Sequence, residues 1–319
     1  DIIFTAYKPK LITNLGFGNF SSFVNIPGAY SYAWKSITSD MDQDGLEDIV
    51  TASLGNDQIT WNKNLGNGSF GNQNLISSIA DGVRDVFAID LNNDTLIDII
   101  SASYNDGKIA WYENLGNGNF GTQQVIVVDP GFSGVVSFDV DSDGLNDVVP
   151  ISLQNSNLYW YKNLGTGGFN QNQITNSNGE GSNLNIVDID NDGLYDLVST
   201  GAAKISWNKN LGNGLFEDNR FVTYRGFAES ISYGDIDNDG DQDIITGEIS
   251  VIIYENINSE FRIKQLLEPN VYSSSTAVSR VSTLVDLDND GYVDALYCDG
   301  ADILWNKNLG NGFFGAQDT

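Results

Sequence analysis

The sequence lacks histidine altogether, contains a single cysteine, and has only 15 lysines and arginines against 43 aspartates and glutamates. The absence of histidine excludes catalytic triads and proton relays built on imidazole, and zinc sites with histidine ligands. Because Cys298 is alone, no disulfide can form within the chain. The few basic residues form no cluster, which disfavours a nucleic-acid partner. No apolar stretch approaches the roughly 20 residues that a membrane-spanning helix requires.

Acidic residues are present in excess, and they are concentrated in a repeated motif. The pattern Asp-x-Asp-x-Asp-Gly-x-x-Asp, or a close relative of it, occurs six times at intervals of 47 to 51 residues. Positions 1, 3, 5 and 9 of these six loops hold 23 of the 43 acidic side chains and account for much of the formal charge of −28. One divalent cation in each loop would bring the net charge to about −16.

Each loop has the composition of a calcium site. Side-chain oxygens at positions 1, 3 and 5, a backbone carbonyl at position 7 and a carboxylate at position 9 form an oxygen shell suited to a hard cation. Position 6 is glycine in five copies, because a sharp bend with positive φ is expected there. The predicted ligands, all for Ca²⁺, are Asp40, Asp42, Asp44, Leu46, Asp48, Asp90, Asn92, Asp94, Leu96, Asp98, Asp139, Asp141, Asp143, Leu145, Asp147, Asp188, Asp190, Asp192, Leu194, Asp196, Asp235, Asp237, Asp239, Asp241, Asp243, Asp286, Asp288, Asp290, Tyr292 and Asp294.

The loop that starts at Asp90 departs from the pattern. Asn92 at position 3 lowers the ligand charge, and Thr95 replaces glycine at a strained position at a cost of ~1–3 kcal/mol. We therefore expect five to six calcium ions, with this site the weakest. Because four crowded carboxylates repel one another without a cation, the simplest role for the calcium is structural. Acidic turns without metal are the competing interpretation, and they explain six copies in register less well.

The segments between the loops are short, rich in Val, Ile and aromatic residues, and separated by Gly and Asn turn signals. In one repeat the apolar segments are 86–89, 98–103, 108–115 and 125–128, with a hairpin turn predicted at 116–118. No helical periodicity of useful length occurs. Four antiparallel strands in each repeat of about fifty residues predict an all-β fold, a β-propeller whose blades are buried on both faces.

The number of blades follows from a second repeated element. An Asn-Leu-Gly-like sequence occurs seven times, and Asp1 aligns with the ninth position of a loop, so the chain begins within a repeat, as a mature or excised piece would. We predict a seven-bladed propeller whose first blade lacks its innermost strand and whose last blade is cut short after Phe314. A six-bladed ring with extra edge strands is the alternative. The predicted single domain covers residues 1–319, with approximate blades 1–29, 30–80, 81–130, 131–178, 179–226, 227–270 and 271–319.

The acidic loop occurs together with the element Trp-x-x-Asn-Leu-Gly-x-Gly-x-Phe, at 61–70, 111–120, 160–169, 207–216 and 305–314. This combination resembles the FG-GAP/VCBS repeat family, which includes the propeller of integrin α subunits and many secreted bacterial proteins. The resemblance implies a calcium-stabilised propeller in an extracellular protein, used for adhesion or ligand binding, with the metal ligands named above. The first and sixth blades depart from it, with Leu11 and Ile253 at the tryptophan position.

The cellular location is argued from the metal loops. A chain without disulfides suits a reducing compartment, whereas millimolar extracellular calcium would saturate even weak sites. We give the six loops more weight and expect a secreted or cell-surface protein. Its expected partners are protein or glycan ligands at a cell surface or matrix, and we expect no nucleic-acid partner and no membrane span. Further domains in a longer chain are left open.

Three functions are compatible with the sequence. The first is a calcium-stabilised binding or adhesion module for protein or glycan ligands. The second is a lectin that uses the repeated tryptophans, although a tryptophan in mid-strand more often packs between blades; Trp34, outside the repeated element, could lie at a channel mouth. The third is a calcium-dependent polysaccharide lyase, which needs a base beside the metal, and Arg84 and Arg225 have no supporting pattern. We therefore expect no enzyme and assign no catalytic residue.

Overall fold

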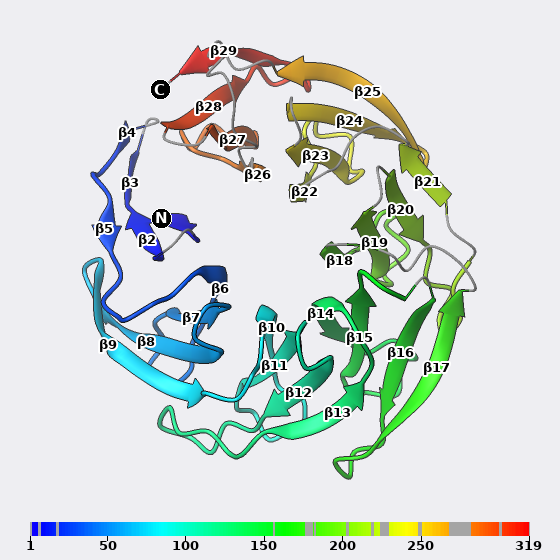
Figure 1. Ribbon diagram of the computed structural model, residues 1–319. Coiled ribbons are helices and arrows are strands. Elements are labelled where there is room, and N and C mark those ends of the chain that lie inside the picture. The colour runs from blue at the N-terminus through cyan, green and yellow to red at the C-terminus, as the bar shows by residue number, and fades with distance from the viewer. Residues whose placement is uncertain are drawn as a thin grey trace. The chain divides into compact units, whose positions relative to one another are not determined.

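The structure is a computed structural model that describes residues 2–5, 8–16, 19–155, 157–175, 181, 183–201, 204–217, 220–223, 230–247, 251–267, 282–299 and 302–318 (Figure 1). These residues form strands, turns and bends, and none of them is in a helix. The chain divides into two compact units. The first comprises Asp1–Leu15, Phe20–Leu184 and Gly212–Leu215, and the second Gly16–Asn19, Asn185–Leu211 and Phe216–Thr319.

Four blades lie in the first unit. The first blade is a three-stranded sheet in the order β1-β2-β5, and the next three have four strands each, in sequence order. The strands are β1 (Ile2–Phe4), β2 (Lys10–Ile12), β5 (Val24–Asn25), β6 (Ala33–Ser39), β7 (Asp48–Ser53), β8 (Gln58–Gly66), β9 (Ser69–Ser77), β10 (Val83–Ile89), β11 (Asp98–Ser103), β12 (Lys108–Tyr112), β13 (Gln124–Val128), β14 (Phe132–Phe138), β15 (Asp147–Ser152), β16 (Leu158–Asn163) and β17 (Phe169–Thr175).

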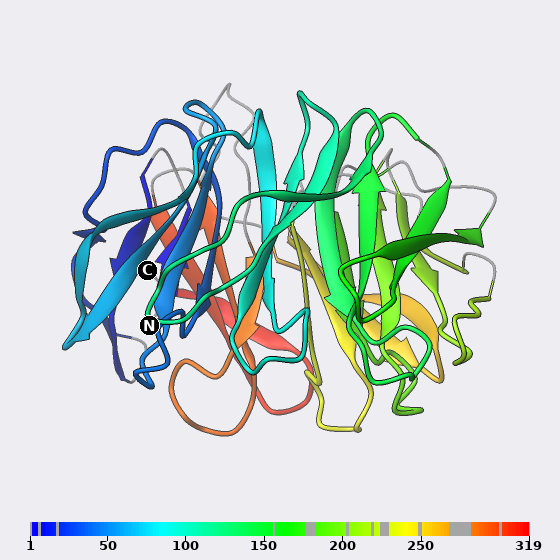
Figure 2. The ribbon, with the colours of Figure 1, turned by 90° about the horizontal axis from the view of Figure 1, so that it is seen from below.

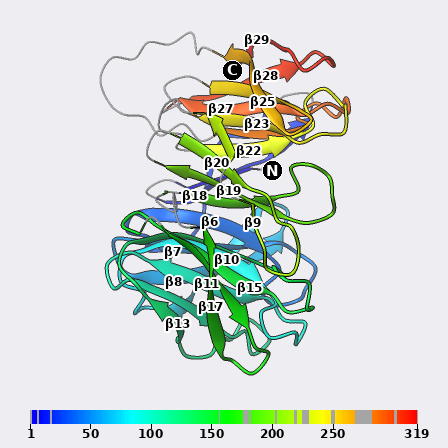
Figure 3. The same ribbon diagram turned by 90° about the vertical axis from the view of Figure 1, so that its right-hand side faces the viewer.

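The other three blades consist mainly of residues of the second unit, and each has four antiparallel strands in sequence order. Figure 3 shows β22, β23 and β25 of one blade beside β27 and β28 of the next. The strands are β18 (Asn183–Val187), β19 (Asp196–Gly201), β20 (Lys204–Asn208), β21 (Arg220–Thr223), β22 (Ser230–Gly234), β23 (Asp243–Gly247), β24 (Val251–Ile257), β25 (Glu260–Leu267), β26 (Ser282–Val285), β27 (Asp294–Asp299), β28 (Asp302–Asn308) and β29 (Phe314–Asp318). A separate ribbon pairs β3 (Asn14–Gly16) with β4 (Asn19–Phe20).

The prediction of an all-β propeller with seven blades is confirmed, and the six-bladed alternative is wrong. The first blade lacks its innermost strand as expected, since β1 occupies the place that β7 has in the next blade. The prediction that the last blade is cut short is wrong. Its fourth strand, β29, begins at Phe314 itself and is five residues long, as β13 is, because the phenylalanine already belongs to the strand. Asp1 lies outside the described residues, and the single domain over 1–319 stays a prediction.

The second strand is buried on both faces in the second, third and fourth blades, which explains its uninterrupted apolar sequence. All six residues of β7, β11 and β15 are buried. Between the second and third blades, Val50 and Trp61 join Val86, Ile99 and Tyr112 in one apolar cluster. Such two-sided burial favours β-branched and aromatic residues over alternation of polar and apolar positions.

The glycine-rich turn after the third strand packs on the tryptophan of the preceding blade. Gly116, Asn117 and Gly118 all have positive φ, as predicted for this hairpin. A Cβ atom on Gly118 would lie 2.2 Å from Cζ2 of Trp61, so only glycine allows the turn to approach the indole ring. The same relation holds between Gly214 and Trp160, at 2.6 Å.

The antiparallel order places different loops at the two ends of the strands (Figure 2). The acidic loops, between first and second strands, share one end with the turns between third and fourth strands. The turns between second and third strands share the other end with the connections to the next blade. Within the described residues no helix is long and apolar enough to cross a membrane.

Candidate metal centres

Each acidic loop is held by hydrogen bonds from its own backbone. In the loop that starts at Asp40, Oδ1 and Oδ2 of this residue accept the N–H groups of Asp44 and Gly45 at 3.1 and 2.8 Å. Asp44 in turn accepts the N–H of Leu46 at 3.0 Å. The same three bonds recur in the other five loops, so all six share one backbone frame.

The carboxylate at position 9 is buried and connects the loop to the third strand of its blade. Asp48 accepts the N–H of Met41 at 2.9 Å and that of Asn64 at 2.7 Å. The equivalent residues Asp98, Asp147, Asp196, Asp243 and Asp294 make the same pair of bonds. This residue is therefore fixed in place whatever occupies the loop.

Burial raises the pKa of these position-9 carboxyl groups. The pKa rises to about 7 for Asp98, Asp147 and Asp243 and to about 6 for Asp196. Hydrogen bonds from two backbone N–H groups act in the opposite direction but do not cancel the cost of burying the charge. A nearby cation would favour the ionised form.

The backbone at position 6 has the predicted conformation. The φ of Gly45 is +86°, and the other four glycines at this position lie between +88° and +98°. Thr95 takes the same conformation, with φ of +77°, which is strained for a β-branched residue. The expectation of strain in this loop is thus confirmed.

Position 4 also has positive φ in all six loops, which the sequence analysis missed. The signal was available, since asparagine, the commonest non-glycine residue in this conformation, occupies four of the six positions. In the first unit two of these side chains link consecutive loops: Gln43 donates to the carbonyl of Thr95 at 3.0 Å, and Asn93 donates to that of Gly144 at 3.1 Å. The acidic loops of the second, third and fourth blades therefore support one another.

Five loops bring three carboxylates close enough to share one ion. In each, one oxygen from each of three residues lies within 4.8 Å of the others. The sets are Asp40, Asp42 and Asp48; Asp139, Asp141 and Asp147; Asp188, Asp190 and Asp196; Asp235, Asp237 and Asp239; and Asp286, Asp288 and Asp290. The role of the position-7 residues as carbonyl ligands stays a prediction.

A second, independent observation indicates that these donor sets fit a cation. In all five of these loops, Oδ1 of the position-3 aspartate is buried and has no hydrogen-bond partner; the residues are Asp42, Asp141, Asp190, Asp237 and Asp288. A buried carboxylate oxygen without a partner is costly. Bound Ca²⁺ would supply the missing interaction, and these loops could hold it through the carboxylates at positions 1, 3, 5 and 9.

The loop that starts at Asp90 differs as its sequence suggests. The Asn92 amide donates to Asp94 at 3.0 Å, so its nitrogen faces the oxygen that would share a cation. Glu113, from the end of the third strand, lies 3.4 Å from the same nitrogen and brings another carboxylate near the loop. That this is the weakest site stays a prediction.

A lysine lies beside each of the other five loops. Nζ of Lys63 contacts Asp42 and lies 2.7 Å from Asp44, and these two carboxylates hold the pKa of Lys63 well above its usual range. Lys162, Lys209 and Lys307 repeat the arrangement, two residues after the repeated tryptophan. In the sixth blade Lys264 of β25 takes this place, 2.7 Å from Asp237. This cation was not predicted from the sequence, although a lysine follows the repeated tryptophan by two residues in four of its five copies.

Other residues singled out from the sequence lie away from these loops. The five repeated tryptophans are at most 8% exposed, which confirms that they pack between blades. Trp34 is 48% exposed. Arg84 lies near the start of β10, whereas the loop of Asp90 follows the end of that strand, so Arg84 is not a base beside that loop. Arg225 lies outside the described residues.

Comparison with known proteins gives both a family and structural relatives. The model of the FG-GAP-like repeat matches residues 40–101, 90–150, 139–199 and 188–246. A solved lectin of Agrocybe aegerita, described as recognising non-reducing terminal N-acetylglucosamine, is 19% identical, with a TM-score of 0.67 over 99% of this chain and 92% of the lectin. Sqt1 of Saccharomyces cerevisiae is 15% identical, with a TM-score of 0.57 over 99% of this chain and 80% of Sqt1.

A third relative is BBS1N, solved in complex with ARL6DN, which is 12% identical and has a TM-score of 0.59 over 89% of this chain and 81% of its own. At such identities these structures show a common fold only. A search of curated proteins finds no match. The family matches overlap in sequence, each begins at the first aspartate of an acidic loop, and together they cover well over half of the chain. The chain therefore belongs to the FG-GAP-like repeat family, as its loops and Trp-x-x-Asn-Leu-Gly elements predicted.

Proposed function

We propose that the protein is an extracellular binding module, a propeller stabilised by calcium in its acidic loops. One observation carries the calcium assignment: the same buried oxygen, Oδ1 at position 3, lacks a partner in five loops. An all-oxygen donor set of carboxylates favours a hard cation, and a shell of five or more protein oxygens suits Ca²⁺ better than Mg²⁺, which usually keeps several waters. Sites of this kind are readily filled at the millimolar calcium of extracellular fluids.

The calcium acts as a structural element in this proposal. Each loop is bonded through its position-9 aspartate to the third strand of its own blade, as Asp48 is to Asn64. A cation that joins this carboxylate to those at positions 1 and 3 would tie the loop to the blade. The stability of the fold would then depend on calcium by mass action.

Calcium content and thermal stability together test this part. The protein is dialysed against calcium, the bound metal is counted by elemental analysis, and the melting temperature is measured with and without a chelator. We expect five to six ions per chain and a large fall of Tm on chelation. Absence of bound calcium together with identical melting curves would refute the assignment.

For the ligand we favour a glycan, on the basis of a pocket in the second unit. Its volume is about 460 Å³, and Trp207, Phe221 and Phe261 line it together with Arg220, Ser259 and Glu260. The guanidinium of Arg220 lies 4.9 Å from the ring centre of Trp207. Trp207 itself is buried, so the exposed ring of Phe221 and the half-buried ring of Phe261 are the ones available to a ligand. Aromatic rings beside a few charged and hydroxyl groups are suited to sugars, which have apolar ring faces and polar edges. The Agrocybe aegerita lectin has the same fold and supports this choice.

A glycan array probed with calcium-loaded protein tests the lectin proposal. Binding is expected, and Phe221→Ala should weaken it because this exposed ring lines the pocket. Phe23→Ala is the matched control: Phe23 is 45% exposed against 41% for Phe221, and each ring has a lysine ammonium about 5 Å from its centre. An array that stays dark would instead favour a protein ligand and an adhesion role.

Binding without catalysis is part of the same proposal. The chain has no histidine, and the lysines beside the acidic loops are poor bases because their carboxylate partners raise the pKa of Lys63 and of its counterparts. A lyase that removes a proton beside bound calcium would need a neutral base there. A lyase assay on acidic polysaccharides should therefore show no product, and product formation would contradict this view.

A further inference from the structure

Three blades of the first unit have the same irregularity at the start of their innermost strand. The pairing with the second strand skips one residue between Ala33 and Lys35, between Val83 and Asp85, and between Phe132 and Gly134. The extra residues are Trp34, Arg84 and Ser133. A bulge of this kind redirects a side chain out of the regular alternation, and bulges are common beside binding sites.

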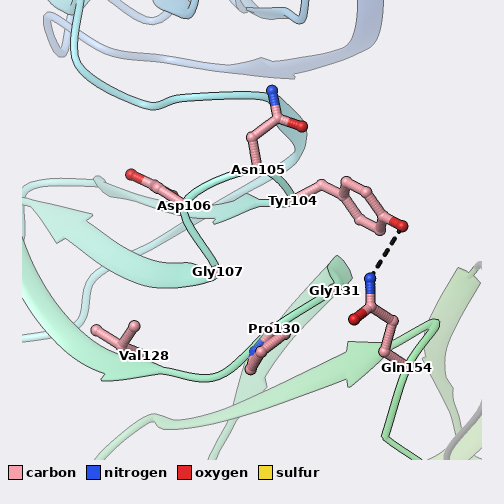
Figure 4. A pocket seen from close by; sticks show the side chains of 8 residues that line it. All are labelled: Tyr104, Asn105, Asp106, Gly107, Val128, Pro130, Gly131 and Gln154. Carbon is pink, nitrogen blue, oxygen red and sulfur yellow. Dashed lines mark hydrogen bonds between the residues drawn. The ribbon is translucent and has the colours of Figure 1, made fainter.

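Two of these extra residues meet a third side chain in an aromatic–cation stack. The guanidinium carbon of Arg84 lies 3.6 Å from the ring centre of Tyr104 and 5.2 Å from that of Trp34. Trp34 is 48% exposed, so much of its ring remains accessible to a ligand. Tyr104 belongs to the turn between β11 and β12, and its hydroxyl accepts a hydrogen bond from Gln154 at 3.1 Å (Figure 4).

Arg84 is the unusual member of this stack. In the described part of the chain it forms no ion pair, and its Nε is buried without a hydrogen-bond partner. The acidic groups near Arg84 in the sequence, and those in the turn of Tyr104, already have partners. Asp85 pairs with Lys35, Asp81 accepts from Asn105, and Asp106 pairs with Lys108. An arginine without a carboxylate partner is notable in a chain with 43 acidic residues.

A pocket adjoins the stack. It has a volume of about 320 Å³, and Tyr104, Asn105, Pro130 and Gln154 are among the residues that line it (Figure 4). This volume lies at the lower end of the range for small-ligand sites. The amide groups of Asn105 and Gln154 can exchange hydrogen bonds with hydroxyl groups of a ligand.

The stack lies far from the acidic loops of its own unit. Arg84 is near the start of β10, and the loop of Asp90 begins after its end; a strand of seven residues is about 20 Å long. At physiological ionic strength the screening length is about 8 Å, so the loop carboxylates scarcely repel an anion bound at Arg84.

We propose that Trp34, Arg84 and Tyr104 form a binding site for a sugar that carries a carboxylate, such as a terminal uronic acid. The carboxylate pairs with the guanidinium of Arg84, whose planar fork matches two carboxylate oxygens. The sugar ring lies against Trp34, and its hydroxyl groups reach the adjoining pocket. This assignment rests on the proposed role of the protein as a glycan-binding module and adds a location and a chemical class to it.

The test compares two oligosaccharides that differ in one group, one ending in glucuronic acid and the other in glucose. Titration calorimetry with the calcium-loaded protein should detect the acidic sugar and a much weaker affinity for the neutral one. Arg84→Gln should weaken binding of the acidic sugar by at least about tenfold, since a hydrogen bond to a charged group is lost. Arg84→Lys keeps the charge without the fork and should retain part of the affinity.

Two further variants separate binding from stability. Trp34→Ala should weaken binding of the acidic sugar while leaving Tm within a few degrees, because the side chain is half exposed. Arg262→Gln is the matched control, since Arg262 is an exposed arginine that already has a carboxylate partner, Glu260, at 3.7 Å. Because Glu260 also lines the pocket of the second unit, the control is read only on binding of the acidic sugar at Arg84, which we expect to be unchanged.

These experiments distinguish failure of the site at Arg84 from failure of the glycan-binding function as a whole. If neutral glycans bind on an array and glucuronic acid does not, the site at Arg84 is wrong and the lectin proposal stands. If Arg84→Gln binds the acidic sugar unchanged, the stack serves only to join blades. If no glycan of any kind binds, both proposals fail.

Discussion

The side-chain amide of Asn114 donates a hydrogen bond to the main-chain carbonyl of Met41, 73 residues earlier in the chain, at 3.0 Å. The same amide reaches the carbonyl of Ile97 in its own blade at 3.0 Å. Asn163, Asn256 and Asn308 repeat this double contact in their blades. The asparagine of the repeated Asn-Leu-Gly element therefore joins the acidic loops of two consecutive blades.

We predict that Asn114→Ala lowers the free energy of unfolding by about 1–3 kcal/mol. The substitution leaves two carbonyl groups without their donor, and Asn114 is only 1% exposed, so water does not readily replace the amide. Chemical denaturation of the calcium-loaded protein gives the free energy directly. Asn119→Ala, in the same turn but with an exposed side chain that donates to Gly116 and Asn117, should cost under about 0.5 kcal/mol. Equal losses in the two variants would contradict the joining role of Asn114.

Thr95 gives a second prediction, because it has the φ of a glycine. Thr95→Gly should stabilise the protein by about 1 kcal/mol, since it removes strain at φ of +77°. The N–H of residue 95 still donates to Asp90, so the frame of the loop is kept. Thermal unfolding in calcium measures the gain. The matched control is Gly144→Thr in the next loop, where the opposite change should lower stability and calcium affinity.

The sequence predicted the fold well, but it predicted fewer of the contacts made by the loops. Its period, turn residues and two-sided apolar strands identified seven blades, six of them with four strands and the first with three, because each repeat solves the same packing problem with the same residues. The missed features depend on contacts between residues far apart in the sequence, either in neighbouring repeats or within one repeat. The bond from Gln43 to Thr95 and the lysine beside Asp42 join residues 52 and 21 positions apart, and a loop motif read by itself does not reveal them. The last blade was predicted to be cut short because only four residues follow Phe314-Gly315, whereas the fourth strand begins at Phe314 itself.

The lysines beside the loops lead to a third prediction. Nζ of Lys63 lies between the carboxylates of Asp42 and Asp44, which the cation also needs. Lys63→Met should therefore strengthen calcium binding at this loop, because a competing positive charge is removed while the apolar stem is kept. Calcium titration calorimetry measures the change, expected at roughly tenfold for one site.

Lys108→Met is the control for that change. Lys108 also pairs with an aspartate, Asp106, at 2.8 Å, and its side chain is 31% exposed against 37% for Lys63. It lies at the end of the strands away from the acidic loops, so its loss should leave calcium affinity unchanged. If Lys63→Met weakens calcium binding, the lysine assists the site rather than competing with the ion.

The buried position-9 carboxyls predict opposite pH dependences with and without calcium. Burial raises the pKa of Asp98, Asp147 and Asp243 from 3.8 to about 7 in the folded chain. Because the folded state then holds protons more tightly than the unfolded state, the stability contributed by these groups is complete below about pH 4 and is lost as the pH rises through about 7. The chelated protein should thus melt at a higher temperature near pH 5 than near pH 8.

With saturating calcium the slope should reverse over the same window. Calcium requires ionised carboxylates, so raising the pH removes the competing proton and strengthens binding to the folded state. Asp147→Asn is the informative variant, because its neutral amide keeps the size of the side chain. It should flatten the pH dependence of the melting temperature of the chelated protein and reduce the increase of that temperature on calcium binding. The hydrogen bond from Lys162 lowers the pKa of Asp143, so that carboxyl group affects stability only at more acidic pH. Parallel pH profiles with and without calcium would show that protons and the ion do not share these carboxylates.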